Sequence, residues 1–571
     1  FSYQDVRGRD LGWGGLRHER VLVFQHSVAE DVGLWFVELE NGVEGSMNFN
    51  ADIFSQETAA RCRGLFEQAL EEVLAAPSRR LDSLLAATLD GGSVPPSPVE
   101  PAGASTVEPA GAGADDALER RVGAVVSAVL GGVPVSRDDD FFELGGHSLL
   151  VAQLVARLKR EFGVALPLRQ VFDAPTVAGI AASIRASTAA PAEAAAPAGR
   201  LAGREQAPMS LMQQRVWFVE QMQPGQVAFH LPGAYRFHGP LDRAALEKAL
   251  RAVVRRQATL QTAFESAEGG AIQRIHRDFV PDLPVEDLSA VPATEREAEL
   301  RRRLAARIAE PMDLAQAPLF RACLYRLDAD QHVFFFMVHH AVWDGGSFDL
   351  FDAEMKTLYE AFVAGRPDPL PALETEYADW AARQREWLQG PQLEAQLARW
   401  LPRLEGHVEP LQLPTDHPRP AVMSGHGDMS YFDLSSERVE AVHLLARSTG
   451  TTPFMVLLST FFVLLHRLGG QRDLITSIPV QGRSQEAVRL VMGFFANTLP
   501  LRLRIAEDAA FGDLLADVRN VVLDALDDAD VPFEHLVRKL GLPRDNSRTP
   551  LSQAMFSYQK PPEKQRRWEI G

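Results

Sequence analysis

Residues 333–348 read VFFFMVHHAVWDGGSF, and the surrounding sequence is best interpreted from this stretch. The apolar residues 333–338 have the length of a buried strand, and a helical stretch starts at Ser347. Two histidines, His339 and His340, stand at the end of the predicted strand, just outside a buried core. Neighbouring strand residues point to opposite faces, so only one of the two can readily face a given cavity.

This geometry argues against His339 and His340 as joint ligands of a metal ion. A metal site would also need further His or Cys residues at regular spacing, which the sequence lacks. We therefore expect no metal. The motif alone leaves two interpretations open, a catalytic histidine and a structural pair.

The motif lies in a long segment, residues 205–571, whose helical stretches and short apolar strands predict a large α/β body. Its longest apolar run, residues 453–465, is too short to span a bilayer and predicts a buried helix. Two linkers rich in Pro, Gly, Ala and Ser, residues 91–114 and 187–204, cannot bury enough surface to order themselves and should act as tethers. They delimit three segments, residues 1–90, 115–186 and 205–571.

The composition of the whole chain sets outer limits. Its 571 residues predict three to four domains at about 150 residues each. A net charge of −18 argues against a nucleic-acid-binding surface made by overall basicity. The two cysteines, Cys62 and Cys323, suit a reducing compartment. We expect a cytoplasmic protein without nucleic acid or membrane partners.

The first segment, residues 1–90, predicts a hairpin followed by a helix. Residues 34–40 and 43–50 form the strands, joined at Asn41-Gly42, because this pair accepts the positive φ of a tight turn. Ser55 is the expected cap of a helix with apolar residues at 66, 69, 70, 73 and 74. One hairpin and one helix make a poor independent core, so the segment should belong to something larger.

The middle segment, residues 115–186, predicts only helices. It contains the motif DFFELGGHSLL (residues 140–150) between a loop and an amphipathic helix, with Ser148 at the N-terminal end of that helix. A phosphate ester on Ser148 would face free backbone N–H groups and the positive end of the helix dipole. The alternative is that Ser148 serves only as an N-cap.

Through this motif the segment resembles the peptidyl carrier domain of nonribosomal peptide synthetases, an all-α four-helix domain. The resemblance implies that Ser148 carries a covalent 4′-phosphopantetheine arm, whose thiol holds an acyl group as a thioester. It implies two partners. One is a phosphopantetheinyl transferase, and the other is an adenylation domain that loads the carrier, either from the same chain or in trans. His147 is assigned to the surface that the transferase recognises.

The long segment resembles the condensation domain of the same synthetases. This family has an α/β two-lobed fold like that of chloramphenicol acetyltransferase. Besides the His-His-Asp-Gly motif, five motifs occur in the family's order: SLMQQRVW (210–217), YADWA (377–381), MGFFANTLPLR (492–502), DVPFE (530–534) and RDNSRTPL (544–551).

The resemblance assigns roles to individual residues. His340 becomes the catalytic histidine, near the amine nucleophile and the thioester carbonyl. Asp344 is expected to be structural and to pair with Arg483, because an unpaired buried charge is costly. Three more residues are assigned to the structure of the site: His339, Gly345, which permits close backbone approach, and Asn497, in its wall.

Three positions depart from the family pattern. Residues 255–262 read RRQATLQT, where Arg-His-Glu-x-Leu-Arg-Thr is usual, Gly346 replaces a common aromatic residue, and Asp528 replaces a frequent histidine. These departures bear on the substrate subtype more than on catalysis.

The implied reaction is amide formation between carrier-bound thioesters, with Ser148 delivering the donor and a downstream carrier presenting the acceptor amine. His340 acts either as a general base or by positioning the amine and stabilising its charge. Two alternatives are an epimerisation domain, against which the Asn-Thr of the central motif argues, and a non-catalytic docking platform for other enzymes.

The tetrapeptide FSYQ occurs at residues 1–4 and again at 556–559. We expect residues 1–90 to be the C-terminal portion of one condensation domain. Residues 205–571 should be the N-terminal lobe and most of the C-terminal lobe of a second one, cut from a longer synthetase. A circularly permuted single domain is the alternative. Strands from residues 34–54 within the sheet of the body would exclude the two-domain arrangement.

Overall fold

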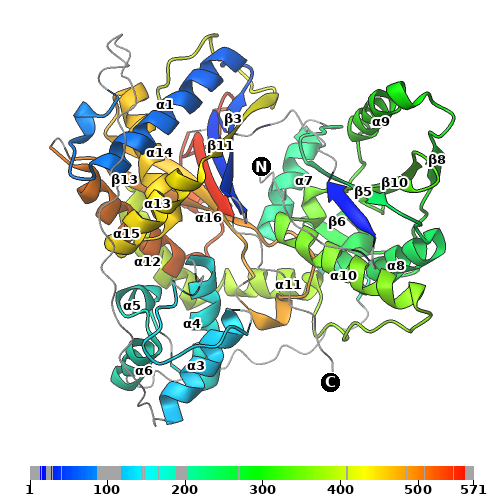
Figure 1. Ribbon diagram of the computed structural model, residues 1–571, viewed down its shortest axis with the longest axis horizontal. Coiled ribbons are helices and arrows are strands. Elements are labelled where there is room, and N and C mark those ends of the chain that lie inside the picture. Colours follow the sequence, from blue (N-terminus) through cyan, green and yellow to red (C-terminus); the bar gives the residue numbers. More distant parts are fainter. Residues whose placement is uncertain are drawn as a thin grey trace.

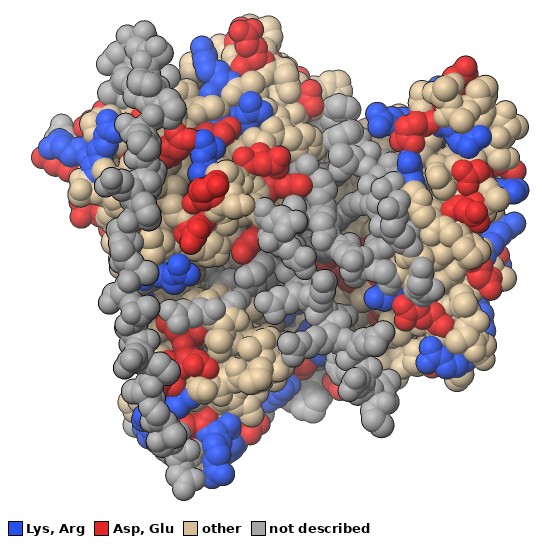
Figure 2. Space-filling model, in the orientation of Figure 1, with Lys and Arg blue, Asp and Glu red and all other residues tan. Residues whose placement is uncertain are grey.

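The computed structural model describes residues 13, 16–20, 28, 30–39, 42–85, 117–130, 132–142, 144, 146, 148–164, 166–187, 204–222, 224–267, 270–406, 409–483, 485–506, 508–543 and 545–559. Figure 1 shows two lobes side by side, with a small helical domain below one of them. Acidic and basic side chains lie interspersed on the face seen in Figure 2. The predicted turn at Asn41, FSYQ at residues 1–4 and nearly all of both linkers lie outside the described residues.

The first lobe is built on a five-stranded sheet with the order β1-β5-β10-β9-β8. The strand predicted from residues 333–338 is its central strand β10 (Gln331–His339), which pairs antiparallel with β5 (His230–His238) and β9 (Phe320–Arg326). The predicted helix is α10 (Gly345–Val363), and its Phe351 stacks on Phe336 of β10. The other elements of this half are β1 (Arg17–Arg20), β4 (Gln206–Pro208), α7 (Leu211–Met222), α8 (Arg243–Arg256), η2 (Ala258–Gln261), β6 (Thr262–Ala267), β7 (Gly270–Ile275), β8 (Val285–Asp287), α9 (Ala293–Ile308) and η3 (His340–Val342), with β4, β7 and β6 forming a separate small sheet.

The second lobe is built on a six-stranded sheet with the order β11-β3-β2-β14-β12-β13. The predicted hairpin is present as β2 (Val32–Leu39) and β3 (Gly42–Asn50). It lies inside the sheet, because β2 pairs in parallel with β14 (Ala554–Gln559) and β3 pairs with β11 (Gly427–Leu434). The other elements are α1 (Gln56–Ala75), η1 (Leu81–Ser83), α12 (Pro391–Leu404), α13 (Ser436–Ser448), α14 (Pro453–Gly469), β12 (Asp473–Val480), η4 (Glu486–Val488), β13 (Asn497–Arg504), α15 (Phe511–Asp527) and α16 (Phe533–Leu540). A further helix, α11 (Tyr377–Trp387), lies against β4 and η2 of the first half.

The expectation that residues 1–90 and 205–571 belong to two separate condensation domains differs from this structure. The hairpin lies between β11 and β14, and without it β11 would have no neighbour in the sheet and β14 would become an edge strand. Phe36 of β2 is fully buried, with ring centroids 5.6 Å from Phe66 and 5.7 Å from Phe556. In this structure the two segments therefore contribute strands to one sheet.

Two predicted helices of this lobe are present. Ser55 caps α1, since its Oγ accepts the backbone N–H of Thr58 at 3.2 Å. The apolar run at residues 453–465 forms α14, which packs against α1 and is buried over most of its length. Among the described residues, α13 and α14 pass a test for a membrane span only as a pair bent by 102°, and no single helix does. Within the described residues of the whole chain, no group of three or more His, Cys, Asp or Glu side chains is placed to hold a metal ion.

The small helical domain consists of α3 (Ala117–Val129), α4 (Ser148–Phe162), α5 (Leu168–Asp173) and α6 (Val177–Ala186), as predicted. Figure 1 shows it below the second lobe, where α5 contacts α15. The Leu168 backbone N–H donates to Asp527 at 3.2 Å, and Arg169 Nη1 donates to Asn520 at 3.0 Å. Two ion pairs, Arg169–Asp524 and Arg519–Asp173, also cross this contact. Apolar side chains of the two domains belong to one cluster.

Candidate active site

The two histidines that end β10 have different surroundings. His340 is 3% exposed; its backbone N–H donates to the Phe229 carbonyl at 2.8 Å, and its ring lies 4.3 Å from that of Phe494. Phe494 comes from the segment between β12 and β13, so His340 lies where the lobes meet. His339 is fully buried in the first lobe, where its Nδ1 accepts the Ala341 N–H at 3.1 Å.

A hydrogen bond fixes the tautomer of His340. Its Nδ1 lies 2.6 Å from the carbonyl oxygen of Trp343. A carbonyl only accepts hydrogen bonds, so Nδ1 carries the proton and Nε2 of the neutral ring keeps its lone pair. Burial lowers the pKa of His340 to about 4, while the Trp343 carbonyl and the Asp344 carboxylate act in the opposite direction. Near pH 7 the ring is therefore neutral, with Nε2 as its basic nitrogen.

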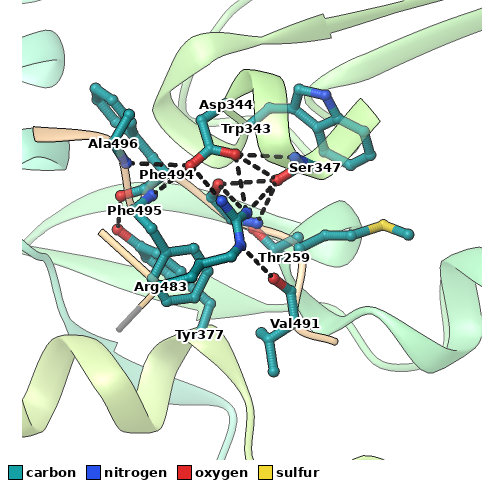
Figure 3. Close-up of polar contacts among 12 residues, drawn as sticks. Thr259, Trp343, Asp344, Ser347, Tyr377, Arg483, Val491, Phe494, Phe495 and Ala496 are labelled. Carbon is teal, nitrogen blue, oxygen red and sulfur yellow. Dashed lines mark hydrogen bonds and ion pairs between the residues drawn. The ribbon is translucent and has the colours of Figure 1, made fainter. Parts of the chain in front are cut away.

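Asp344 pairs with Arg483, as the sequence predicts. Arg483 Nη1 and Nη2 donate to the two carboxylate oxygens at 2.9 and 2.8 Å. The Arg483 side chain is 8% exposed, and that of Asp344 is 1% exposed. Oδ1 also accepts the backbone N–H and the hydroxyl of Ser347 at 3.0 and 2.9 Å, so Asp344 is the N-cap of α10. Figure 3 shows this network, in which the buried charge is matched by charge-assisted hydrogen bonds.

The segment of residues 490–497 ties this network to the second lobe. The backbone N–H groups of Phe495 and Ala496 donate to the second aspartate oxygen at 2.9 and 3.1 Å. The Tyr377 hydroxyl donates to the carbonyl oxygen of Phe494 at 2.7 Å. These contacts hold the Phe494 ring in place beside the catalytic-histidine candidate.

Glycine at position 346 explains one departure from the family pattern. Gly345 opens α10, and Gly346 follows it. A Cβ atom added at Gly346 would lie 2.6 Å from Arg483 Nη1, which is closer than non-bonded atoms approach. The common aromatic residue is therefore incompatible with the position that Arg483 occupies here.

Asn497 supports a turn, and its hydrogen bonds do not include His340. Its Nδ2 donates to the carbonyl oxygens of Ala529 and Val531 at 2.9 and 2.8 Å, and its Oδ1 accepts the N–H of Phe533 at 3.1 Å. These contacts fasten the start of α16 to β13. Asn497 therefore supports the backbone before α16, and its place in the wall of the active site stays a prediction.

Asp528, another departure, is fully buried at the end of α15. Arg399 Nε donates to its carboxylate at 2.9 Å, Arg403 Nη1 lies 3.0 Å from it, and Trp400 Nε1 donates to its backbone carbonyl at 2.9 Å. A charged residue with two arginine partners on α12 therefore takes the place of the family's histidine.

Three side chains that hold the site backbone were not singled out from the sequence: Gln213, Gln257 and Thr259. Gln257 donates to the carbonyl of Leu490 and accepts the N–H of Met492, both at 3.0 Å, which fastens the 490–497 segment to the first lobe. All three lie in or beside recognised motifs, and Gln257 and Thr259 lie in the departing stretch 255–262. Motif membership does not reveal which backbone group each one reaches.

Ser148 begins the fifteen-residue helix α4, apart from the group formed by His340, Asp344 and Arg483. His147 and the Ser148 side chain lie outside what the structure describes. The first N–H groups of a long helix lack intrahelical partners and suit a phosphate ester. Gly146 packs so closely on Phe141 that an added Cβ would lie 2.3 Å from its ring. These features fit a phosphopantetheine attachment site.

Two parts of the chain match known families. Residues 204–569 match the condensation domain family, and residues 120–184 match the phosphopantetheine attachment site family. The chain therefore belongs to the condensation domain family and includes a carrier domain, both of the nonribosomal peptide synthetase type. The predicted fold class, a two-lobed α/β domain with an all-α carrier, is confirmed.

Curated relatives agree with this assignment. One polypeptide of the linear gramicidin synthase of Brevibacillus parabrevis is 41% identical over 77% of this chain and 8% of its own length. Tyrocidine synthase 3 of the same organism is 37% identical over 77% of this chain and 6% of its own length. The chain thus spans a small part of these relatives.

Two solved structures resemble the condensation domain. One is the X-domain from teicoplanin biosynthesis, with a TM-score of 0.57 and 28% identity over 62% of this chain and 78% of that one. The other is the first condensation domain of the calcium-dependent antibiotic synthetase in complex with a substrate analogue, with a TM-score of 0.51 and 25% identity over 62% of this chain and 79% of that one.

Proposed function

We propose that this chain forms an amide bond in nonribosomal peptide synthesis. The carrier presents an acyl or peptidyl thioester at Ser148, and the condensation domain joins it to an amine on a downstream carrier. The observation that carries the proposal is the state of His340, which is buried between the lobes and neutral, with Nε2 as its basic nitrogen.

The chemistry needs few groups from the protein. When bound to Ser148, phosphopantetheine supplies the thiol that holds the acyl group as a thioester. The amine nitrogen attacks the thioester carbonyl carbon, the carbon–sulfur bond breaks, and the thiol leaves with the proton that the amine gives up. His340 Nε2 either relays this proton as a general base or positions the amine and stabilises its charge. Holding both substrates by tethers makes the attack effectively unimolecular.

The proposed reaction requires three partners. A phosphopantetheinyl transferase modifies Ser148, an adenylation domain loads the thiol, in trans if it lies on another chain, and a downstream carrier presents the acceptor amine. Cys62 and Cys323 are free thiols, which supports a site of action in the reducing cytoplasm.

The direct test is an amide-forming assay with mass spectrometry. The chain is phosphopantetheinylated, loaded with an acyl group and mixed with an acceptor carrier bearing an aminoacyl thioester. His340→Ala should lower the rate of amide formation about 100- to 10,000-fold. His276→Ala, at an exposed histidine, is the matched control and should keep the wild-type rate. Ser148→Ala should prevent loading altogether.

Each alternative has its own outcome in this assay. Unchanged amide formation by His340→Ala would contradict the proposal. An epimerised donor without amide product would identify an epimerisation domain. A loaded carrier that stays unreacted while the body binds another enzyme would identify a docking platform. This last alternative is tested because the teicoplanin X-domain was also solved in complex with OxyB.

We also propose that residues 1–90 and 205–571 work as one condensation domain around the carrier. The hairpin within the second sheet supports this arrangement. Phe36→Ala removes a fully buried ring from that contact and should lower the free energy of unfolding by about 3–5 kcal/mol, measured by urea denaturation. Phe218→Ala, at a ring that is 54% exposed, is the control. Equal stability of the two variants would contradict a shared lobe.

A further inference from the structure

The turn after β10 has three consecutive carbonyl groups, and each accepts a hydrogen bond from a side chain. The Ala341 oxygen accepts from Gln213 Nε2 at 3.1 Å. The Val342 oxygen accepts from Thr259 Oγ1 at 3.0 Å, and the Trp343 oxygen accepts from His340 Nδ1 at 2.6 Å. Two of these donors come from other elements, α7 and η2, and the third is the candidate catalytic residue.

The amide of Gln213 has a fixed orientation. Its side chain is fully buried, and its Oε1 accepts the backbone N–H of Ser210 at 3.0 Å. Its Nε2 therefore points the other way, where it reaches the Ala341 carbonyl and, at 3.2 Å, Oε1 of Gln273. The Gln273 side chain in turn donates to the carbonyl of Pro208 at 2.8 Å. This chain of amides anchors the turn to the small sheet.

Thr259 is 4% exposed and stands directly before Leu260 in η2. Its hydroxyl has one hydrogen to donate, and the Val342 carbonyl takes it. Because the Val342 and Trp343 peptides are adjacent, fixing one carbonyl restricts the rotation of the next. Thr259 and Gln213 together thus restrict the movement of the turn that carries the Trp343 oxygen.

We infer that Gln213 and Thr259 are positioning residues that set the tautomer of His340. They act through the turn, which keeps the Trp343 carbonyl on Nδ1 and so leaves Nε2 as the nitrogen with the lone pair. Without them the carbonyl shifts, the ring samples the other tautomer, and Nε2 carries a proton in part of the molecules. The inference rests on the proposed function, because it assigns a purpose to the orientation of His340.

The test uses pairs of nearly isosteric variants of the loaded full chain. Thr259→Val removes the hydroxyl and keeps the shape, and we expect amide formation to slow about tenfold. Thr259→Ser restores the donor and should recover most of the rate. Gln213→Glu keeps the acceptor for the Ser210 N–H but loses the donor to the turn, and it should also slow the reaction. Thr357→Val is the matched control, because Thr357 donates to the Ala353 carbonyl on the exposed side of α10.

A second readout separates positioning from loss of structure. In protein labelled with nitrogen-15 at histidine, the chemical shifts of His340 Nδ1 and Nε2 report the tautomer directly, and the His340→Ala spectrum identifies the signals. We expect the Nδ1-protonated form in wild type, Thr259→Ser and Thr357→Val, and mixed tautomers in Thr259→Val.

The outcomes distinguish this inference from the proposed function. An unchanged tautomer and rate in Thr259→Val, alongside an inactive His340→Ala, would overturn the inference alone. A mixed tautomer in Thr259→Val with full activity in His340→Ala would uphold the positioning and overturn the proposed function.

Discussion

The molecule has two ion-paired joints that differ mainly in burial. Between the lobes, Asp344 and Arg483 are 1% and 8% exposed, and both carboxylate oxygens accept additional hydrogen bonds. Between the carrier and the condensation domain, Arg169 and Asp524 are 40% and 44% exposed and meet at 3.2 Å, and Arg519 and Asp173 are 18% and 56% exposed and meet at 2.6 Å.

Burial gives the two joints different properties. Removing one partner of a buried pair costs about 3–5 kcal/mol, because the other charge is left without compensation. An exposed pair contributes about 0–1 kcal/mol and weakens in salt. The lobes are thus fixed around His340, whereas the carrier is held by contacts that can be exchanged. The proposed function needs this difference, since a carrier must meet its loading partner as well as the condensation site.

The largest effect is expected from breaking the buried joint. Arg483→Ala leaves the Asp344 carboxylate buried without its cation, and the free energy of unfolding should fall by about 3–5 kcal/mol in urea denaturation. Arg489→Ala is the control, because Arg489 and its partner Glu486 are 50% and 42% exposed. This substitution should lower the free energy of unfolding by less than about 1 kcal/mol. Similar losses in both variants would mean that burial does not distinguish the pairs.

A smaller loss is expected from crowding the same joint. Gly346→Ala places a Cβ 2.6 Å from Arg483 Nη1, which displaces a guanidinium held by several hydrogen bonds. We expect the free energy of unfolding to fall by about 1–3 kcal/mol and amide formation to slow. Gly64→Ala is matched to it, because Gly64 lies in α1 with nothing within 4 Å of an added Cβ, and it should be neutral or slightly stabilising. A fully active and stable Gly346→Ala would show that Arg483 has room to move.

The pH dependence of amide formation tests the burial of His340, which lies where the two lobes meet. Its pKa of about 4 lies below the usual 6.5 of histidine because of burial, so Nε2 stays unprotonated as the pH falls from 7 to about 5. The rate of amide formation should decline only near pH 4, by about tenfold per pH unit below it. The unfolded chain binds this proton at higher pH than the folded one does, so stability falls as the pH drops from 6.5 towards 4. A decline in wild-type rate centred near pH 6.5 would contradict the buried, neutral ring.

Local patterns predict most of the elements that compose these joints. The apolar run 333–338 lies in β10, the two strands predicted on either side of Asn41 form the β2–β3 hairpin, with Gly42 already in β3, and Ser55 caps α1. The Asp344–Arg483 pair was predicted through motif resemblance, and the structure shows its bonds. Each of these signals lies within a few residues of chain or within a motif with a known order.

The features that the sequence did not reveal depend on contacts between distant residues. The pairing of β2 with β14 joins residues at opposite ends of the chain, and nothing in either strand names its partner. Gln213 reaches Ala341 only after the fold brings α7 to the turn. The space at Gly346 is decided by where Arg483 lies, so the substitution at 346 looked like a departure until its neighbour was known.

The smallest effect concerns the exposed joint, and it tests whether charge or apolar contact holds the carrier. Arg169→Asp should reduce the docked population by less than about fivefold, because exposed pairs contribute about 0–1 kcal/mol. The change can be followed by the amide signal of Leu168, whose N–H donates to Asp527 in the docked state. Combining Arg169→Asp with Asp524→Arg should restore docking, and added salt should weaken it in wild type. Arg121→Asp breaks a comparably exposed pair with Glu161 inside the carrier and should leave that signal unchanged. If Arg169→Asp leaves the docked population unchanged and the double variant does not increase it, the apolar cluster shared by the two domains holds the carrier. The two joints would then differ in apolar contact more than in the exposure of their charges.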